Sequence, residues 1–232
     1  MGMKNKSAVV IFSGGLDSTT VLYYALNSGY NVHAISYEYG QKHIIEIQRA
    51  KKIIELNKNT QHIIVPISAR LFTNSALTGH GIIPKDRHDI NQEFIPVTYV
   101  PARNLIFLSI AAAYAESNDI HEIFIGINSQ DYSGYPDCRN DFISSFETTV
   151  NLATKAGRSS NGISIKTPLA DLNKKEIIQL GKDLHVPFHL TWSCYDPYTD
   201  SSDQQKPCNH CDSCLLRLKG FHDAGINESE IS

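Results

Sequence analysis

The sequence predicts an α/β protein built on one Rossmann-like, doubly wound parallel sheet. Short apolar runs rich in β-branched residues alternate with segments of helical period along most of the 232 residues. The runs are continuously apolar, which is typical of strands that helices cover on both faces. The helical segments between them supply the crossover connections that parallel strands require.

The first half of the chain contributes three strands and two helices. The run AVVIF at residues 8–12 is followed by a helical pattern at residues 18–27. VHAISY at residues 32–37 precedes a helix at residues 42–56, in which isoleucines recur near helical spacing. HIIVPI at residues 62–67 is the third strand. These alternations are the pattern expected of βαβ units.

The second half continues the pattern. We expect a helix at residues 104–117, a strand at residues 122–127 and a helix at residues 140–155. A further strand at residues 163–169 and a helix at residues 174–184 complete the series. Open parallel sheets bind ligands beyond the carboxyl ends of their strands. The loops after the strands should therefore meet at one ligand-binding edge.

The length suits a single domain. We expect the α/β core at residues 8–189, a small metal-binding subregion at residues 190–221 and a tail at residues 222–232. The segment at residues 73–94 has weak periodicity and mixed polarity. It is interpreted as a lid, an interface arm or a disordered surface loop.

Composition narrows the function classes. Hydrophobic residues make up 41% of the chain and charged residues 19%, as in globular proteins. The net charge of -3 offers no overall basic surface for nucleic acid. No apolar run reaches the length of a membrane span, and the first residues have no signal-peptide core. We expect a cytoplasmic protein with neither membrane nor nucleic-acid partners.

The stretch SGGLDS at residues 13–18 follows the first strand and opens a helix. Adjacent glycines let backbone N–H groups approach an anion, and a helix N-terminus attracts negative charge. Ser13 and Ser18 add hydroxyl donors. Asp17 is unusual beside an anion unless it caps the helix or holds a metal ion. The lysine of a Walker loop and the spacing of a dinucleotide fingerprint are both absent from this stretch.

Ser-Gly-Gly-x-Asp-Ser after a first strand resembles the PP-loop of the ATP pyrophosphatases, which have the adenine nucleotide alpha hydrolase-like fold. The resemblance implies that ATP is cleaved between its α- and β-phosphates, that the loop holds pyrophosphate and that Mg²⁺ accompanies ATP. TPLADLNKKEI at residues 167–177 is similar to a second segment of this superfamily, and the match makes Lys174 rather than Lys175 the implied phosphate contact.

The resemblance and the positions of the loops assign two groups of residues. Catalytic charges that neutralise phosphate or hold magnesium are expected at Asp17, Arg103 and Lys174. The residues expected to bind ATP are Phe12, Ser13, Gly14, Gly15, Leu16, Asp17, Ser18, Tyr37 and Gln41. His43 is the histidine near a site loop, and we expect it at the surface.

Cys194, Cys208, Cys211 and Cys214 form the pattern C-x13-C-x2-C-x2-C, which predicts a structural zinc site. An iron–sulfur cluster is the alternative, but the ferredoxin-like run with a fourth cysteine and a proline is absent. His210 is a further candidate to replace one cysteine.

The segment GINSQDYSGYPDCRNDF at residues 126–142 is similar to a segment of the 7-cyano-7-deazaguanine synthase family. YVPARNLIFLSIAA at residues 99–112 and the cysteine region extend the resemblance from about residue 8 to residue 221. It implies ATP-dependent conversion of 7-carboxy-7-deazaguanine and ammonia to the nitrile, through an adenylated carboxylate and an adenylated amide, in queuosine biosynthesis. AMP and pyrophosphate would be released, and the family resemblance suggests a homodimer.

Within this resemblance, Asp131 or Asp137 would bind the base, Tyr132 and Tyr135 would stack on it, and Arg139 would meet the substrate carboxylate. The alternative is another adenylating enzyme, such as a tRNA-modifying thiolase or a lysidine-type synthetase. A thiolase needs a sulfur-carrying cysteine near the nucleotide, and Cys138 is the candidate for it. A non-catalytic nucleotide sensor is disfavoured because the charged residues of the site are present.

Overall fold

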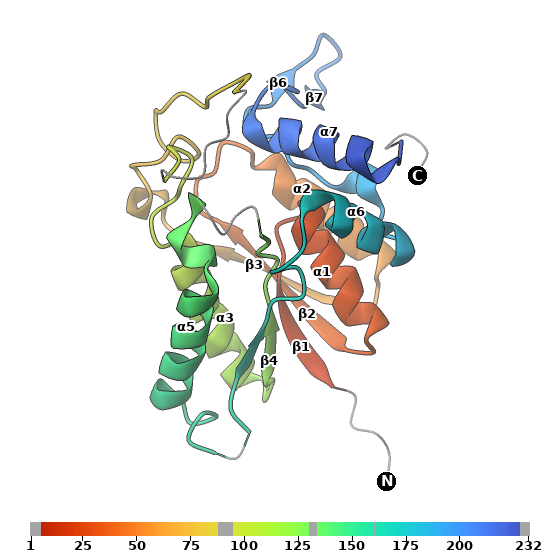
Figure 1. The fold of residues 1–232 in the computed structure, drawn as a ribbon. Helices are drawn as coiled ribbons and strands as arrows, with labels where there is room; N and C mark the ends of the chain where they lie inside the picture. Colours follow the sequence, from red (N-terminus) through yellow and green to blue (C-terminus); the bar gives the residue numbers. More distant parts are fainter. Residues whose placement is uncertain (1–5, 88–94, 130–133, 160, 228–232) are drawn as a thin grey trace.

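The structure, a computed structural model, describes residues 6–87, 95–129, 134–159 and 161–227. Five strands form one parallel sheet in the order β3-β2-β1-β4-β5, with helices on both faces (Figure 1). The strands are β1 (Ser7–Ile11), β2 (Asn31–Glu38), β3 (Gln61–Pro66), β4 (Glu122–Phe124) and β5 (Ser164–Lys166). The predicted doubly wound α/β fold is confirmed.

The helices are α1 (Leu16–Asn27), α2 (Ile45–Leu56), α3 (Arg103–Ser117), α5 (Asn140–Ala153), α6 (Lys174–Asp183) and α7 (Asp212–Ala224). Short 3-10 helices lie at Ala69–Leu71, Pro136–Cys138 and Phe188–Leu190. All five predicted helices and five predicted strands are present, although β4 and β5 are shorter than expected. The helix α7 runs past the expected start of a tail at residue 222, and the division of the chain into subregions stays a prediction.

The two faces of the sheet bury separate cores. The helices α3 and α5 lie on one face, and α1 and α6 lie on the other (Figure 1). Alternate residues of β1 point to opposite faces: Val9 packs in the core under α3 and α5, whereas Val10 packs in the core under α1, α2 and α6. The strand order reverses beside β1, because β2 and β4 flank it on either side. This reversal opens a crevice beyond the carboxyl ends of β1 and β4, where open α/β sheets bind ligands.

The edge strand β5 is covered by polar side chains of α5. The Ile163 N–H donates to Asn151 Oδ1 at 2.8 Å, and Asn151 Nδ2 donates to the Ile163 carbonyl at 2.7 Å. The Ile165 N–H donates to Glu147 Oε2 at 2.6 Å. Glu147 and Asn151 are one helical turn apart, so they reach alternate residues of the strand. The outward N–H groups of the edge are thereby satisfied within the chain.

The C-terminal region packs against the core through α7, which lies beside α6 (Figure 1). Phe221 of α7 meets the ring of Phe188 edge-on at 5.3 Å between centroids. Arg217 donates to the Phe188 carbonyl at 2.9 Å and to Thr191 Oγ1 at 2.8 Å. The long polar connection between Cys194 and Cys208 forms an antiparallel hairpin of β6 (Tyr198–Thr199) and β7 (Gln205–Lys206), which the sequence did not indicate.

The described part of the segment at residues 73–94 packs onto the protein. Ala76, Leu77 and Ile83 are buried in the core. Lys85 forms a β-bridge with Cys211, and Lys85 Nζ lies 2.8 Å from Asp196 Oδ2. A disordered surface loop is therefore the wrong interpretation for residues 73–87, because this stretch is held by both apolar burial and backbone pairing. The lid and the interface arm remain predictions.

Across the described ranges, every helix is too short or too polar to cross a bilayer.

We predict that Asn151→Ala lowers the free energy of unfolding by about 1–3 kcal/mol, because it leaves the buried N–H and carbonyl of Ile163 without their amide partner. Chemical denaturation followed by circular dichroism measures this change. Asn27→Ala is the control, since Asn27 is exposed and its amide bonds to its own helix at the Tyr23 carbonyl. Equal free energies of unfolding of the two variants would show that the hydrogen bonds between Asn151 and Ile163 do not stabilise the fold.

Candidate active site

A cavity of about 710 Å³ lies at the carboxyl edge of the sheet. The loops after β1, β2 and β4 line it, together with the first turns of α3 and α6 and the region around the four cysteines. These strands, β2, β1 and β4, are neighbours in the sheet, so the shared ligand-binding edge predicted above is present as a cavity.

The loop after β1 depends on a glycine at position 14. Gly14 has φ +84°, in the left-handed region that favours glycine. A β-carbon there would lie 2.7 Å from both the Ala50 nitrogen and the Glu46 carbonyl oxygen of α2. The Gly14 carbonyl also accepts a hydrogen bond from the Trp192 N–H at 3.0 Å. The loop is therefore held between α2 and the segment that leads to Cys194.

Two serine hydroxyls lie at the N-terminus of α1. Ser13 Oγ and Ser18 Oγ are 3.0 Å apart, and the Gly15 N–H donates to Ser13 Oγ at 3.2 Å. Gly15 is the N-cap residue of α1 and supplies no side chain, so the first N–H groups of the helix have no side-chain cap from it. A helix N-terminus with adjacent hydroxyls is suited to bind an anion such as phosphate.

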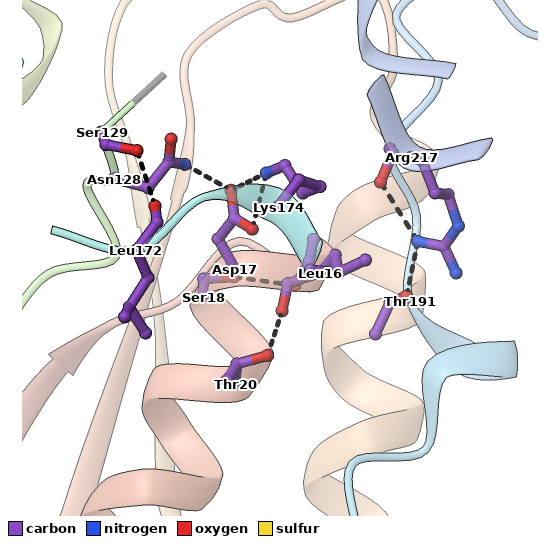
Figure 2. Close-up of polar contacts among 12 residues, drawn as sticks. Leu16, Asp17, Ser18, Thr20, Asn128, Ser129, Leu172, Lys174, Thr191 and Arg217 are labelled. Atoms are coloured by element: carbon purple, nitrogen blue, oxygen red, sulfur yellow. Dashed lines mark hydrogen bonds and ion pairs between the residues drawn. The ribbon is translucent and has the colours of Figure 1, made fainter. Parts of the chain in front are cut away.

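Asp17 does not cap α1, because it is the second residue of the helix rather than its N-cap. Its carboxylate instead lies between two partners from other elements, as Figure 2 shows. Lys174 Nζ donates to Asp17 Oδ1 at 2.8 Å and to Oδ2 at 2.7 Å, and Asn128 Nδ2 donates to Oδ2 at 3.0 Å. The helix-capping interpretation of Asp17 is corrected here.

Lys174 is positioned by the start of α6. Asn173 is its N-cap, and a capping box joins Asn173 and Glu176 through reciprocal hydrogen bonds of 3.1 and 2.8 Å. This box fixes the first turn of the helix, so Lys174 extends toward Asp17 across the crevice. Lys175, the next residue, is exposed.

Arg103 begins α3 and lines the cavity. Burial alone would lower the pKa of its guanidinium, but the charges of Tyr39, Cys138 and Asp137 raise that pKa above its ordinary value. Asp137 Oδ2 accepts a hydrogen bond from the Asn104 N–H at 2.9 Å, at the open first turn of α3. One carboxylate oxygen of Asp137 thus accepts a hydrogen bond from a backbone N–H in the first turn of α3.

The loop after β2 is braced by Gln41. Its Oε1 accepts from the Tyr39 N–H at 2.8 Å, and its Nε2 donates to the Tyr37 carbonyl at 3.0 Å. The Tyr37 ring stacks on Phe107 at 4.0 Å between centroids, and its hydroxyl donates to the Phe107 carbonyl at 2.7 Å. Burial raises the pKa of Tyr37, which therefore stays neutral.

The structure brings most of the predicted site residues to the cavity. Those that line it are Phe12, Ser13, Gly15, Leu16, Asp17, Ser18, Tyr37, Gln41, Arg103, Tyr135 and Lys174. Gly14 lies beneath the loop, and Asp137 and Arg139 are not among the residues lining the cavity. Asp131 and Tyr132 lie outside the described residues. The roles assigned to these residues remain predictions.

Several residues of the site were not anticipated. Asn128 contacts Asp17 without lining the cavity itself; it follows β4, and its position at the predicted edge is the signal that could have indicated it. His43 was expected at the surface, but it is 2% exposed and lines the cavity. That expectation is wrong, because the chain between β2 and α2 turns inward under Tyr195 rather than outward. Glu46, Arg87 and Arg217 also reach the cavity from segments without a recognisable motif.

The four predicted metal ligands converge. The sulfur atoms of Cys194, Cys208, Cys211 and Cys214 all lie within 4.8 Å of one another, and all four residues are buried. Backbone N–H groups donate to the sulfurs: Cys208 N–H to Cys194 Sγ at 3.2 Å, and Cys211 N–H to Cys208 Sγ at 3.3 Å. Hydrogen bonds within the cluster lower the pKa of Cys211 and raise the pKa of Cys194 and of Cys214.

His210 points away from this cluster. Its Nδ1 lies 2.7 Å from Asp86 Oδ1, and the Asp86 N–H donates to the His210 carbonyl at 2.8 Å. The alternative in which His210 replaces a cysteine ligand is disfavoured, since its ring nitrogen is engaged by the 73–87 segment. Four sulfurs at this spacing are compatible with one tetrahedral metal ion.

Comparison with known proteins decides the family. A family model described as "Queuosine biosynthesis protein QueC" matches residues 7–225. The chain belongs to the QueC family. A curated relative from Leptospira interrogans, named 7-cyano-7-deazaguanine synthase, is 49% identical over 225 residues, covering 97% of this chain and 90% of the relative. A synthase of the same name from Thermoplasma volcanium is 50% identical over 221 residues, covering 95% of this chain and 88% of the relative.

A solved 4-thiouridine synthetase–RNA complex with bound ATP shares the fold of this QueC family member. Its TM-score is 0.52 at 16% sequence identity, and the match covers all of this chain (100%) and 54% of that chain. At this identity the likeness concerns the fold. This shared fold agrees with the resemblance of SGGLDS to the PP-loop.

We predict that Lys174→Met weakens binding of magnesium–ATP by about 10- to 100-fold, because it removes a charge-assisted contact at the phosphate loop. Lys175→Met is the matched control, since its side chain is exposed and one residue away. Isothermal titration calorimetry measures both affinities. A larger loss in the Lys175 variant would reverse the assignment of the phosphate contact.

Proposed function

We propose that this chain converts 7-carboxy-7-deazaguanine and ammonia to 7-cyano-7-deazaguanine, using ATP and releasing AMP and pyrophosphate. The observation that carries the proposal is the similarity, over almost the whole chain, to relatives named 7-cyano-7-deazaguanine synthase. The cavity supports it, because a phosphate-binding loop, cationic side chains and aromatic rings line one space.

The chemistry explains why such a cavity needs ATP. A carboxylate and ammonia do not condense at neutral pH, because proton transfer gives a salt and the oxygen of a carboxylate is a poor leaving group. Transfer of AMP to the carboxylate provides a leaving group that ammonia displaces to form the amide. Adenylation of the amide oxygen then permits elimination of AMP to the nitrile. The protein has to align the reactants, stabilise phosphate charge and exclude water.

In this proposal the N-terminus of α1 and the hydroxyls of Ser13 and Ser18 hold the pyrophosphate portion of ATP. Lys174 and Arg103 neutralise the phosphate oxygens from two sides. The carboxylate of Asp17 fits a magnesium ligand, because it lies in the cavity beside the phosphate loop and oxygen is the ligand that Mg²⁺ prefers. Lys174 Nζ, now on Asp17, would turn to the phosphates when the nucleotide is bound.

The deazaguanine is proposed to bind on the side of the cavity that α3 and Tyr135 line. The Tyr135 hydroxyl lies 3.1 Å from Thr98 Oγ1, which orients its ring. Asp137 is a weaker candidate to bind the base than Asp131, because one of its oxygens is engaged with α3. Arg139, the N-cap residue of α5, is exposed and would have to reach the substrate from outside the cavity lining.

The four-cysteine cluster is proposed to hold structural zinc. Four buried cysteine sulfurs are the donor set that zinc prefers, and they leave no open position for a substrate; backbone N–H groups donate to the sulfurs of Cys194, Cys208 and Cys211. We further propose that the protein acts in the cytoplasm as a homodimer on small molecules, without nucleic acid. The resemblance suggests the dimer, and the slightly acidic net charge of -3 supports the absence of a nucleic-acid partner.

Incubation of the protein with 7-carboxy-7-deazaguanine, ammonium, magnesium and ATP is expected to yield the nitrile, AMP and pyrophosphate, detected by mass spectrometry and liquid chromatography. Asp17→Ala is expected to lower turnover by at least about a hundredfold while the protein stays folded, because a magnesium ligand and the partner of Lys174 are lost. A wild-type protein that consumes no ATP under these conditions would refute the proposed function.

Metal analysis of the purified protein is expected to give about one zinc per chain. Cys211→Ser should lose the metal and several kcal/mol of stability, because metal binding contributes folding free energy directly. Cys138→Ser is the control, since Cys138 is equally buried but outside the cluster. Iron in place of zinc, or full metal content in the Cys211 variant, would contradict the zinc assignment.

A further inference from the structure

His43 and Glu46 form a pair in the cavity that the proposed roles above do not use. His43 Nε2 lies 3.4 Å from Glu46 Oε2, and the side chains are 3% and 13% exposed. His43 Nδ1 is buried and makes no hydrogen bond to any part of the chain that the structure describes. A buried ring nitrogen without a partner is costly unless a ligand or a proton transfer uses it.

The pair lies beside the phosphate loop. Glu46 is in the first turn of α2, and its Oε1 is 4.0 Å from the position that a β-carbon on Gly15 would occupy. Its backbone carbonyl oxygen is closer still to the loop, 2.7 Å from the position of a β-carbon on Gly14. An acyl adenylate has its carbonyl carbon directly bonded to the oxygen of the α-phosphate, so this carbon must also lie near the loop.

The charge of Glu46 is unsuited to phosphate and suited to a cation. The described carboxylates that line the cavity are Asp17, Glu46 and Asp212. Asp17 pairs with Lys174, and Asp212 accepts two hydrogen bonds from Arg87. Within the described ranges, the ion-pair partner of Glu46 is His43, whose charge depends on its protonation. Of the three described carboxylates that line the cavity, Glu46 is therefore the one without a lysine or arginine as its ion-pair partner.

The surroundings fit ammonium better than magnesium. Tyr39 and Tyr195 line the same cavity, and the Tyr195 ring is 5.7 Å from the His43 ring, whereas the Trp192 ring is already covered by the guanidinium of Arg49. Aromatic faces attract organic and ammonium-type cations. Mg²⁺ instead requires several oxygen ligands in octahedral arrangement, and Glu46 is paired here with an imidazole nitrogen rather than with a second carboxylate.

We infer that Glu46 and His43 form the site that binds ammonium and removes its proton. The inference rests on the proposed function, since ammonium is the form of the nitrogen substrate that predominates at neutral pH. Glu46 accepts N–H bonds from the cation, and the imidazole of His43 takes one proton to give ammonia. The released lone pair forms the C–N bond to the acyl adenylate. The C–O bond to AMP breaks, AMP leaves with the electron pair, and a second proton passes from nitrogen to water.

Glu46→Gln tests the cation-binding half of this site. It keeps the size of the side chain but removes the charge, and it should raise the KM for ammonium by about tenfold or more. Exchange of pyrophosphate into ATP, dependent on 7-carboxy-7-deazaguanine and measured without ammonium, should stay within about twofold of wild type, because adenylation precedes the nitrogen. Glu46→Asp, which keeps the charge, should recover part of the ammonium affinity.

His43→Gln tests the proton-accepting half. Its turnover at saturating ammonium should fall by about tenfold or more, whereas pyrophosphate exchange is retained. Hydroxylamine is neutral at pH 7 and needs no deprotonation before attack. Hydroxamate formation from the acyl adenylate should therefore stay within about twofold of wild type in both variants.

Glu55→Gln, exposed on the same helix, and His189→Gln, exposed in a 3-10 helix, are the matched controls. Unchanged ammonium kinetics in the Glu46 and His43 variants would overturn the inference. So would a parallel loss of exchange, hydroxamate and nitrile, since the pair would then serve ATP binding or folding. Absence of exchange in the wild type would instead refute the proposed function, and the inference with it.

Discussion

The close approach of the Gly14 backbone to helix α2 is the constraint on which the site depends. With 2.7 Å between a hypothetical β-carbon and the backbone of α2, the loop after β1 touches the helix directly. The same residue accepts a hydrogen bond from Trp192. Three parts of the chain that are distant in sequence therefore meet at one glycine. These contacts fix the relative positions of the phosphate loop, the Glu46–His43 pair and the segment from Trp192 to Cys194.

Charge in the cavity is arranged in opposed pairs. Asp17 faces Lys174, and Asp212 faces Arg87, so neither carboxylate presents an unbalanced negative charge to a nucleotide. Arg103 and Arg217 also line the cavity, and the charges of Tyr39, Cys138 and Asp137 raise the pKa of the Arg103 guanidinium. Cationic side chains beyond these two pairs therefore face the cavity and can stabilise the charge of a bound polyanion.

The sequence predicted the sheet and its ligand-binding edge because both follow from local periodicity. The positions of Ser13, Asp17 and Lys174 could also be predicted, since SGGLDS and the segment around Lys174 are contiguous motifs. The Glu46–His43 pair could not, because its position depends on how α2 packs beneath Gly14 rather than on any pattern in residues 42–56. The hairpin at Tyr198–Thr199 and Gln205–Lys206 was missed for a related reason: two-residue strands leave no periodicity to detect.

The covering of β5 by Glu147 and Asn151 limits how copies of this chain can associate. A second molecule extends a sheet only where outward N–H and carbonyl groups are available, and the N–H groups of Ile163 and Ile165 are already bonded to α5. Self-association through this edge would have to displace two side chains that are part of the folded monomer. The β5 end of the sheet is therefore a closed boundary, and a dimer that extended the sheet would have to use the opposite edge strand, β3.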